Sequence, residues 1–187
     1  MENLDIWLLK AIRAEDNKGI MSGWLEERRL ELTPLFRQAL RHLFSRGSFI
    51  VLTDSARKWF GDYITQSINL PNKTRPFFSI FEINSLGFII DSTLRDTQDR
   101  GFLSIFKMLD NSFCQNYAFW YIGKKSTRSE FALVRDNSFV WLLDERLPNT
   151  LTLSSADELL DFKLLQLYRL FEQAFCAAIL GQLSIEP

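Results

Sequence analysis

The segment from Phe49 to Phe60 constrains the fold more than any other part of the chain. An unbroken apolar run, Phe49 to Leu52, leads into polar residues that can cap a helix, which is typical of a buried parallel strand followed by its crossover helix. In α/β proteins that bind nucleotides or phosphosugars, this turn usually carries glycines that let backbone N–H groups approach a phosphate. Here the turn is Thr53-Asp54-Ser55-Ala56. An uncompensated carboxylate at the start of a helix repels an anion, so the sequence favours a binding role over chemistry.

Strands and helices alternate along the rest of the chain. We expect strands at 49–53, 76–83, 117–122, 138–144 and, as a short fifth, 150–153. We expect helices at 4–12, 22–47, 56–68 and 99–113, a short one opened by a capping box at 127–130, and a long one from a capping box at 155–158 to near Gly181. Loops are expected at 69–74 and around 84–87. This order predicts an α/β fold with a doubly wound, mainly parallel sheet of four or five strands, flanked by helices in three layers.

Length and composition set further limits. The 187 residues fit one domain, so a single α/β domain is expected over 1–187. With 22 Lys and Arg against 23 Asp and Glu, and no basic block, direct nucleic-acid binding is disfavoured. The 17 Phe and 5 Trp supply more large apolar surface than one modest core needs. Some of these aromatic side chains are therefore expected at subunit or partner contacts. Thr33-Pro34 is consistent with two abutting helices or one kinked helix.

The N-terminal residues and the apolar runs bear on location. The first residues lack the basic start and apolar core of a signal peptide. The longest apolar run, 174–180, is too short to span a bilayer. We therefore expect a cytoplasmic protein without a membrane partner.

Residues that could carry catalysis are scarce. His42 is the only histidine and lies beside Leu40 and Leu43, so a packing role is favoured over base catalysis. Cys114 and Cys176 are expected to be reduced thiols inside apolar segments, and no metal, cofactor or catalytic residue is predicted. Carboxylates at strand ends, such as Asp54 and Asp144, nevertheless lie at the edge where α/β proteins place their sites.

The turn after the third strand contains the residue types of a phosphate loop. The residues Gly123-Lys124-Lys125-Ser126-Thr127-Arg128 follow directly on that strand. A phosphate loop needs a first glycine several residues earlier, and the strand occupies that position. A basic turn with a helix cap is therefore favoured, with a weak anion site as the alternative.

The long C-terminal helix has more apolar surface than one sheet requires. One face carries Leu160, Leu164, Leu167, Phe171, Ala174 and Ala178. Phe162 and Leu165 instead fall within the polar arc, which suggests a second contact surface. A second copy of the same chain is the favoured occupant, so Phe162 and Leu165 are predicted oligomer-interface residues.

Four groups of residues together resemble the HobA family of bacterial regulators of replication initiation. They are Ser22-Gly23-Trp24-Leu25-Glu26; Asp54-Ser55 with Arg57, Trp59-Phe60 and Tyr63-Ile64; Phe119-Trp120 with Gly123-Lys124; and Leu159-Leu160-Asp161 with Lys163-Leu164-Leu165-Gln166-Leu167. The resemblance covers nearly the whole chain in order. It implies a fold similar to sugar-isomerase (SIS) and flavodoxin-like domains, a homotetramer built as a dimer of dimers, and no enzymatic activity. It also implies binding to the N-terminal domain of the initiator DnaA, with assembly of DnaA promoted at the origin.

A different class of function stays open beside this one. The alternative is a phosphosugar isomerase or phosphosugar sensor with a divergent loop. Both turns depart from the SIS enzyme pattern, which would place glycines at 53–55 and serines at 123–127. Because a ligand that binds only the native state stabilises it, a thermal shift with phosphosugars would separate the two readings.

The helix after the first strand is the predicted DnaA contact. We expect Ala56, Phe60, Ile64 and Ser67 to face the sheet, with Trp59 and Tyr63 at the margin. Gly61, on the opposite side, costs roughly 1 kcal/mol relative to Ala, which either a closely approaching chain or helix packing within the tetramer would explain. The predicted partner-binding residues are Arg57, Lys58, Trp59, Gly61, Asp62, Tyr63 and Thr65.

Overall fold

A computed structural model describes residues 2–70, 75–93 and 98–185. The chain divides into two compact units, each described by itself: one comprises residues 42–155, and the other comprises 1–41 with 156–187. The expected loop at 69–74 lies mostly outside the described residues.

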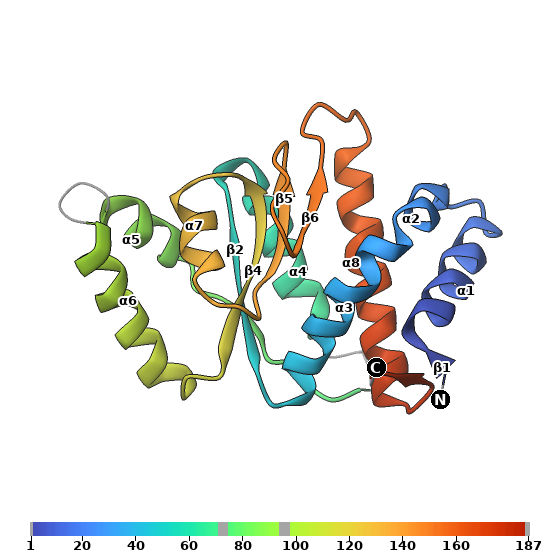
Figure 1. Ribbon diagram of the computed structural model, residues 1–187, viewed down its shortest axis with the longest axis horizontal. Coiled ribbons are helices and arrows are strands. Elements are labelled where there is room, and N and C mark those ends of the chain that lie inside the picture. Colours follow the sequence, from blue (N-terminus) through green and yellow to red (C-terminus); the bar gives the residue numbers. More distant parts are fainter. Residues whose placement is uncertain (1, 71–74, 94–97, 186–187) are drawn as a thin grey trace. The chain divides into compact units, whose positions relative to one another are not determined.

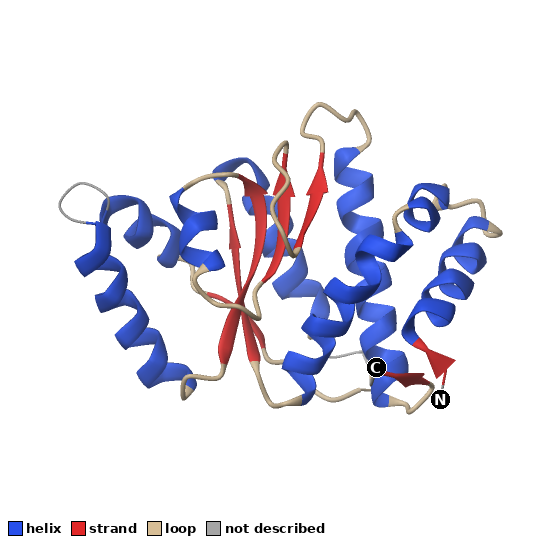
Figure 2. Cartoon of the chain, in the orientation of Figure 1, coloured by secondary structure: helices blue, strands red, loops and turns tan. Residues whose placement is uncertain are grey.

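The unit of residues 42–155 is built on a five-stranded sheet whose strands all pair in parallel (Figure 2). In spatial order the strands are β3 (Ile80–Glu82), β2 (Ser48–Thr53), β4 (Tyr117–Lys124), β5 (Phe139–Leu143) and β6 (Thr150–Leu153). Nearly every strand position is buried, which explains why these strands are visible as apolar runs. The chain passes from β2 to β3 on one side and then returns to β4 on the other side. The strand order therefore reverses between β2 and β4, the point where open α/β sheets bind ligands.

Helices cover both faces of this sheet (Figure 1). On one face, α4 (Lys58–Ile68) follows the short 3₁₀ helix η1 (Ser55–Arg57) and lies against Val51 and Thr53 of β2. On the other face are α5 (Leu86–Thr93), α6 (Gln98–Phe113) and α7 (Thr127–Leu133), which pack on Ile50, Phe119 and Val140 in one buried cluster. The prediction of a doubly wound parallel sheet flanked by helices in three layers is confirmed.

Two predicted elements near β3 differ from the structure. The expected strand 76–83 is reduced to Ile80–Glu82, because the backbone N–H and C=O of Phe78 bond instead to the Asn69 side chain at 2.8 and 2.9 Å. Of the loop expected around 84–87, Asn84 and Ser85 do form a turn, but α5 begins at Leu86, and Leu86 and Ile90 are both buried one turn apart. Sequence analysis missed this helix.

Both predicted capping boxes are misplaced. The N-cap of α7 is Ser126, whose backbone N–H donates to Ser129 Oγ at 2.9 Å, so the box lies one residue before the predicted 127–130. The long helix α8 begins at Leu160, not within 155–158, and the Asp157 carboxylate accepts the backbone N–H of Leu159. Ser155 is not its cap, since it bonds to Asp144.

The other unit is mainly helical. It contains α1 (Leu4–Asp16), α2 (Gly23–Glu27), most of α3 (Arg29–Phe44), α8 (Leu160–Ile179) and the short parallel strands β1 (Glu2–Asn3) and β7 (Leu183–Ser184). The break between α2 and α3 falls at Arg28, and α3 continues through Pro34. The predicted apolar face of α8 is buried from Leu160 to Ala174. In the described ranges, none of the helices combines the length and apolar character needed to cross a membrane.

Candidate functional site

The turn after β2 meets the turn after β4 at the switch point of the sheet. Asp54 Oδ1 accepts the backbone N–H of Arg57 at 2.9 Å, and Asp54 Oδ2 accepts the backbone N–H of Lys124 at 2.8 Å. The Arg57 guanidinium lies 3.1 Å from Oδ2 as an ion pair. The expectation of an uncompensated carboxylate at Asp54 is therefore wrong: the charge is held by two backbone donors and a cation. We call Asp54, Arg57, Tyr121, Lys124 and Arg128 the switch-point edge.

Arg57 belongs to this edge and not to an exposed helix face. Its side chain is only 13% exposed. Its Nε and Nη2 atoms are buried and make no hydrogen bond to the residues that the structure describes, so charge alone holds the guanidinium beside Asp54. Arg57 thus offers little surface to a binding partner.

Tyr121 and Gly123 close the edge from β4. The Tyr121 hydroxyl donates to the backbone carbonyl of Lys124 at 2.5 Å and lies 3.1 Å from Ser126 Oγ. Burial raises the pKa of Tyr121 to about 12, so the hydroxyl stays a donor at neutral pH. A Cβ at Gly123 would lie 2.8 Å from both the Asp54 carboxylate and the Tyr121 hydroxyl. The glycine at this turn therefore makes room for the protein's own side chains.

Arg128 ties a third segment to the same edge. Its Nη1 donates to the carbonyl of Thr53 at 2.8 Å, and its Nε and Nη2 form a two-pronged pair with Asp91 at 3.0 and 2.5 Å. The hydrogen bond that Arg128 donates to Asp91 is the main cause of the raised pKa of Arg128. Asp91 is not among the predicted site residues, because it lies on α5, a helix that the sequence pattern did not predict.

The two lysines of the turn are paired with acids. Lys124 Nζ lies 3.0 Å from Asp144 Oδ2, and Lys125 Nζ lies 3.1 Å from Glu145 Oε2. These ion pairs favour the interpretation as a basic turn, and they disfavour the alternative of a weak anion site. Asp144, in the left-handed region at φ 67°, also accepts the backbone N–H of Ser155 at 2.7 Å and its hydroxyl at 2.6 Å. These bonds, with Lys124, lower the pKa of Asp144 to about 2.

The outward side of α4 carries the second group of predicted residues. Trp59 and Tyr63 are 40% and 43% exposed, as expected for the margin of the helix. Lys58 Nζ pairs with Asp62 at 3.0 Å and with Glu82 at 3.4 Å. We call Lys58, Trp59, Asp62, Tyr63 and Thr65 the α4 surface.

On the side of α4 that faces the sheet, two residues differ from the predictions. Phe60 and Ile64 are buried as expected, but Ala56 is exposed because it lies in η1 before α4 begins. Gly61 is buried and does not lie on the outward side: a Cβ there would be 3.1 Å from Thr53 Cγ2 and 3.5 Å from Val51 Cγ1. The close approach of α4 to β2 explains this glycine, so its placement among exposed partner-binding residues is wrong.

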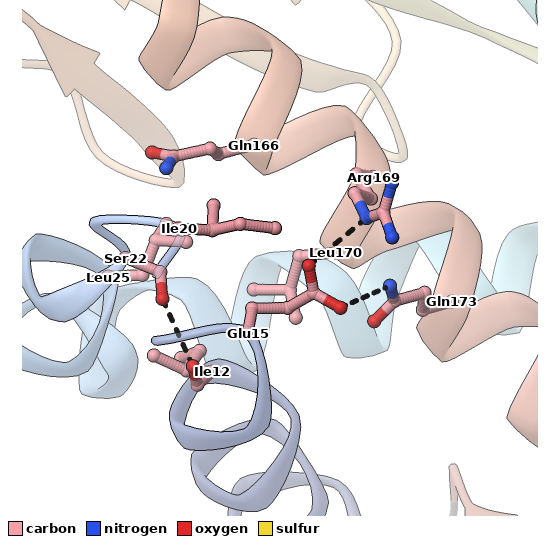
Figure 3. A pocket seen from close by; sticks show the side chains of 9 residues that line it. All are labelled: Ile12, Glu15, Ile20, Ser22, Leu25, Gln166, Arg169, Leu170 and Gln173. Carbon is pink, nitrogen blue, oxygen red and sulfur yellow. Dashed lines mark hydrogen bonds and ion pairs between the residues drawn. The ribbon is translucent and has the colours of Figure 1, made fainter. Parts of the chain in front are cut away.

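In the mainly helical unit, α8 borders two hollows. The smaller one, of about 20 Å³, has room for one water molecule at most. Beside it Glu15 lies 3.3 Å from both Arg169 Nε and Gln173 Nε2 (Figure 3). Burial opposes ionisation of Glu15, but the hydrogen bond from Lys18, together with Gln173 and Arg169, lowers the pKa of this carboxyl below its usual value. The packing here is therefore structural.

The larger hollow is a groove of about 540 Å³ lined by Met21, Trp24, Leu159, Phe162 and Gln166, among others. Trp24 Nε1 donates to Gln166 Oε1 at 2.6 Å, which joins two of the sequence groups that carry the resemblance. Phe162 is 67% exposed at this groove and Leu165 is half-buried.

The remaining candidates for chemistry are occupied by packing. His42 is buried beside Phe49, and its Nε2 lies 3.0 Å from the carbonyl of Ser48, which agrees with a packing role. Burial lowers the pKa of His42. Cys114 is exposed, not inside an apolar segment, and Cys176 is half-buried; the two thiols are not joined in a disulfide. Across the described residues, no three His, Cys, Asp or Glu side chains gather to hold a metal ion.

Residues 42–155 thus define an α/β protein of flavodoxin-type strand order whose ligand-binding edge is filled by its own side chains. A model of the HobA family, described as a DNA replication regulator, matches residues 1–185. The chain belongs to this family. It is 31% identical to the DNA replication regulator protein HobA of Helicobacter pylori over 99% of this chain and 100% of that protein.

Two solved structures from Helicobacter pylori are similar. A crystal structure of a HobA–DnaA (domain I–II) complex matches with a TM-score of 0.73 and 31% identity, covering 98% of this chain and 99% of that one. A crystal structure of HobA matches with a TM-score of 0.71 and 30% identity over the same shares.

Proposed function

We propose that this chain is a non-enzymatic regulator of replication initiation that binds the N-terminal domain of the initiator DnaA in the cytoplasm. The observation that carries this proposal is the likeness, over 98% of the chain, to a HobA chain from a complex with domains I–II of DnaA. Membership of a family of replication regulators supports the same process.

The switch-point edge supports the absence of catalysis. Asp54 occupies the position where related folds bring a phosphate to bare backbone donors, and its carboxylate accepts the N–H groups of Arg57 and Lys124. Tyr121 is held protonated and Arg128 is engaged by Asp91 and the Thr53 carbonyl. A substrate phosphate would have to displace a covalently attached carboxylate, which disfavours the phosphosugar alternative.

The α4 surface is the proposed contact for DnaA. It combines two half-exposed aromatic side chains, Trp59 and Tyr63, with the Lys58–Asp62 ion pair, and aromatic side chains are the usual energetic centre of an interface. Both rings pack against Phe60, at centroid distances of 5.4 and 6.5 Å. Gly61 and Arg57 are not part of the proposed contact, although both were predicted as partner-binding residues, because both face inward.

We propose a homotetramer, built as a dimer of dimers, in which Phe162 and Leu165 of α8 contribute to a contact between copies. The exposure of Phe162 beside the groove supports this placement. Several copies of the α4 surface in one assembly would hold several DnaA molecules close together. Their effective concentration for assembly at the origin would rise without any contact between this protein and DNA.

Calorimetry with the N-terminal domain of DnaA tests the function and its placement. We expect the wild-type chain to bind, and Trp59→Ala or Tyr63→Ala to weaken binding by about 2 kcal/mol, roughly 30-fold. Phe88→Ala is the matched control, because Phe88 is a 74% exposed aromatic on α5, away from α4. No binding by the wild-type chain would overturn the function. Wild-type affinity in both α4 variants, each with unchanged fold, would overturn only the placement.

A further inference from the structure

We propose that Asp54 is a built-in anion whose carboxylate closes an oxyanion site at the β2–β4 switch point. The site takes phosphate-class anions once that carboxylate is removed. The proposal does not depend on DnaA binding.

The donors of this site come from two segments far apart in the sequence. The Arg57 N–H, at the junction of η1 and α4, and the Lys124 N–H, at the end of β4, donate to the two oxygens of one carboxylate at 2.9 and 2.8 Å. The Arg57 guanidinium lies 3.1 Å from the same group. Two converging backbone donors with one arginine are a usual way to hold an oxyanion in proteins.

The environment of the Arg57 guanidinium is a second observation that points to an anionic ligand. Its guanidinium is largely buried, with Nε and Nη2 shielded from solvent and without a hydrogen bond to the described residues. A buried cation without a counter-charge is costly, so Asp54 supplies the charge that this position requires. With residue 54 shortened, a mobile anion has to supply it.

The surroundings decide what can enter. Gly123 leaves no side chain over the carboxylate, since a Cβ there would be 2.8 Å from Asp54 Cγ. Lys124 Nζ is shared with Asp144, and Arg128 is shared with Asp91, so neither adds a free charge. One free positive charge and two N–H donors suit a small oxyanion such as inorganic phosphate or sulfate.

Three substitutions of Asp54 distinguish an effect on anion binding from an effect on folding. Asp54→Gly removes the carboxylate, and Asp54→Ser removes it while keeping a hydroxyl that can cap the helix. Asp54→Asn is the matched control, because its amide fills the same space without charge. Melting temperatures of the full chain are measured in sodium phosphate and in sodium chloride of equal ionic strength.

We expect phosphate to raise the melting temperature of Asp54→Gly and Asp54→Ser but not of the wild-type chain or Asp54→Asn. Phosphate should bind the first two at least about tenfold more tightly than it binds the wild type, by phosphorus NMR line broadening. Adding Arg57→Gln to Asp54→Ser should abolish the response. A phosphate response equal to that of the wild type in both Asp54→Gly and Asp54→Ser would overturn the proposal, as would a response that survives Arg57→Gln. If Asp54→Gly fails to fold in chloride, the Asp54→Ser result decides.

Discussion

Two helices, α4 and α8, present aromatic side chains outside their buried faces, and they do so in different ways. On α4, the Trp59 and Tyr63 rings pack against Phe60 and are a little under half exposed. On α8, Phe162 is two-thirds exposed and lines a groove of about 540 Å³. An aromatic pair braced by its own helix makes a fixed surface that another protein can contact. A projecting ring beside a hollow suits a self-complementary contact, in which each copy fills the groove of the other.

The largest expected effect tests whether the two sides of α4 differ as described. Phe60→Ala should lower the free energy of unfolding by about 3 to 5 kcal/mol, because Phe60 is fully buried with its ring 6.1 Å from that of Trp141. Trp59→Ala, one residue away, should lower it by only about 1 kcal/mol. Urea denaturation measures both. Equal losses would mean that Trp59 supports the core, and the α4 surface would lose its main anchor.

A second prediction separates α8 from α4. Phe162→Glu should weaken the multimer by roughly tenfold to a hundredfold, since a buried Phe contributes about 1.5 to 3 kcal/mol. Phe88→Glu is the matched control, because Phe88 is a similarly exposed aromatic on α5. Light scattering over a dilution series measures the mass, and calorimetry should show unchanged DnaA affinity per protomer. If the Phe162→Glu chain keeps the wild-type mass at low concentration, Phe162 is not at the contact.

The smallest expected effect concerns the start of α8. An ion pair and hydrogen bond with Lys163, together with the Leu159 N–H, lower the pKa of Asp157. A carboxyl with a lowered pKa in the folded state stabilises the fold above its unfolded pKa, near 3.8, and this contribution disappears as pH falls through the folded value. Asp157→Asn should therefore be slightly less stable than the wild type at pH 6, with the difference vanishing as the pH falls well below 3.8. A gap that is constant across pH would exclude this origin.

The sheet could be predicted from the sequence because parallel strands are buried on both faces and appear as apolar runs. The segment around β3 could not, since Phe78 bonds to the Asn69 side chain and this pairing leaves no periodic pattern. The Asp54–Lys124 bond spans 70 positions, and the Arg128–Asp91 pair spans 37. Sequence analysis identified Asp54 as unusual but could not identify its partners, because tertiary structure alone brings them together.

The error at Gly61 has a related cause. A helical wheel places residues around an axis but contains no distance from that axis to the sheet. The wheel predicts Gly61 on the outward side, yet α4 approaches β2 so closely that a Cβ at this position would lie only 3.1 Å from Thr53 Cγ2. Phe60, Ile64, Trp59 and Tyr63 were placed correctly, because for these side chains size and polarity indicate the degree of burial.

The same glycine has a consequence for recognition. A Cβ at Gly61 would lie 3.1 Å from Thr53 Cγ2 and 3.5 Å from Val51 Cγ1, so α4 packs closely on β2 and has little room to move on the sheet. The helix backbone that carries Trp59 and Tyr63 is consequently held in place before any partner arrives. Association through such a surface costs little backbone entropy, because the helix is already fixed on the sheet in the free protein. A substitution at Gly61 that still permits folding should then weaken partner binding indirectly. It would remove no contact with the partner, but it would add an entropic cost to binding.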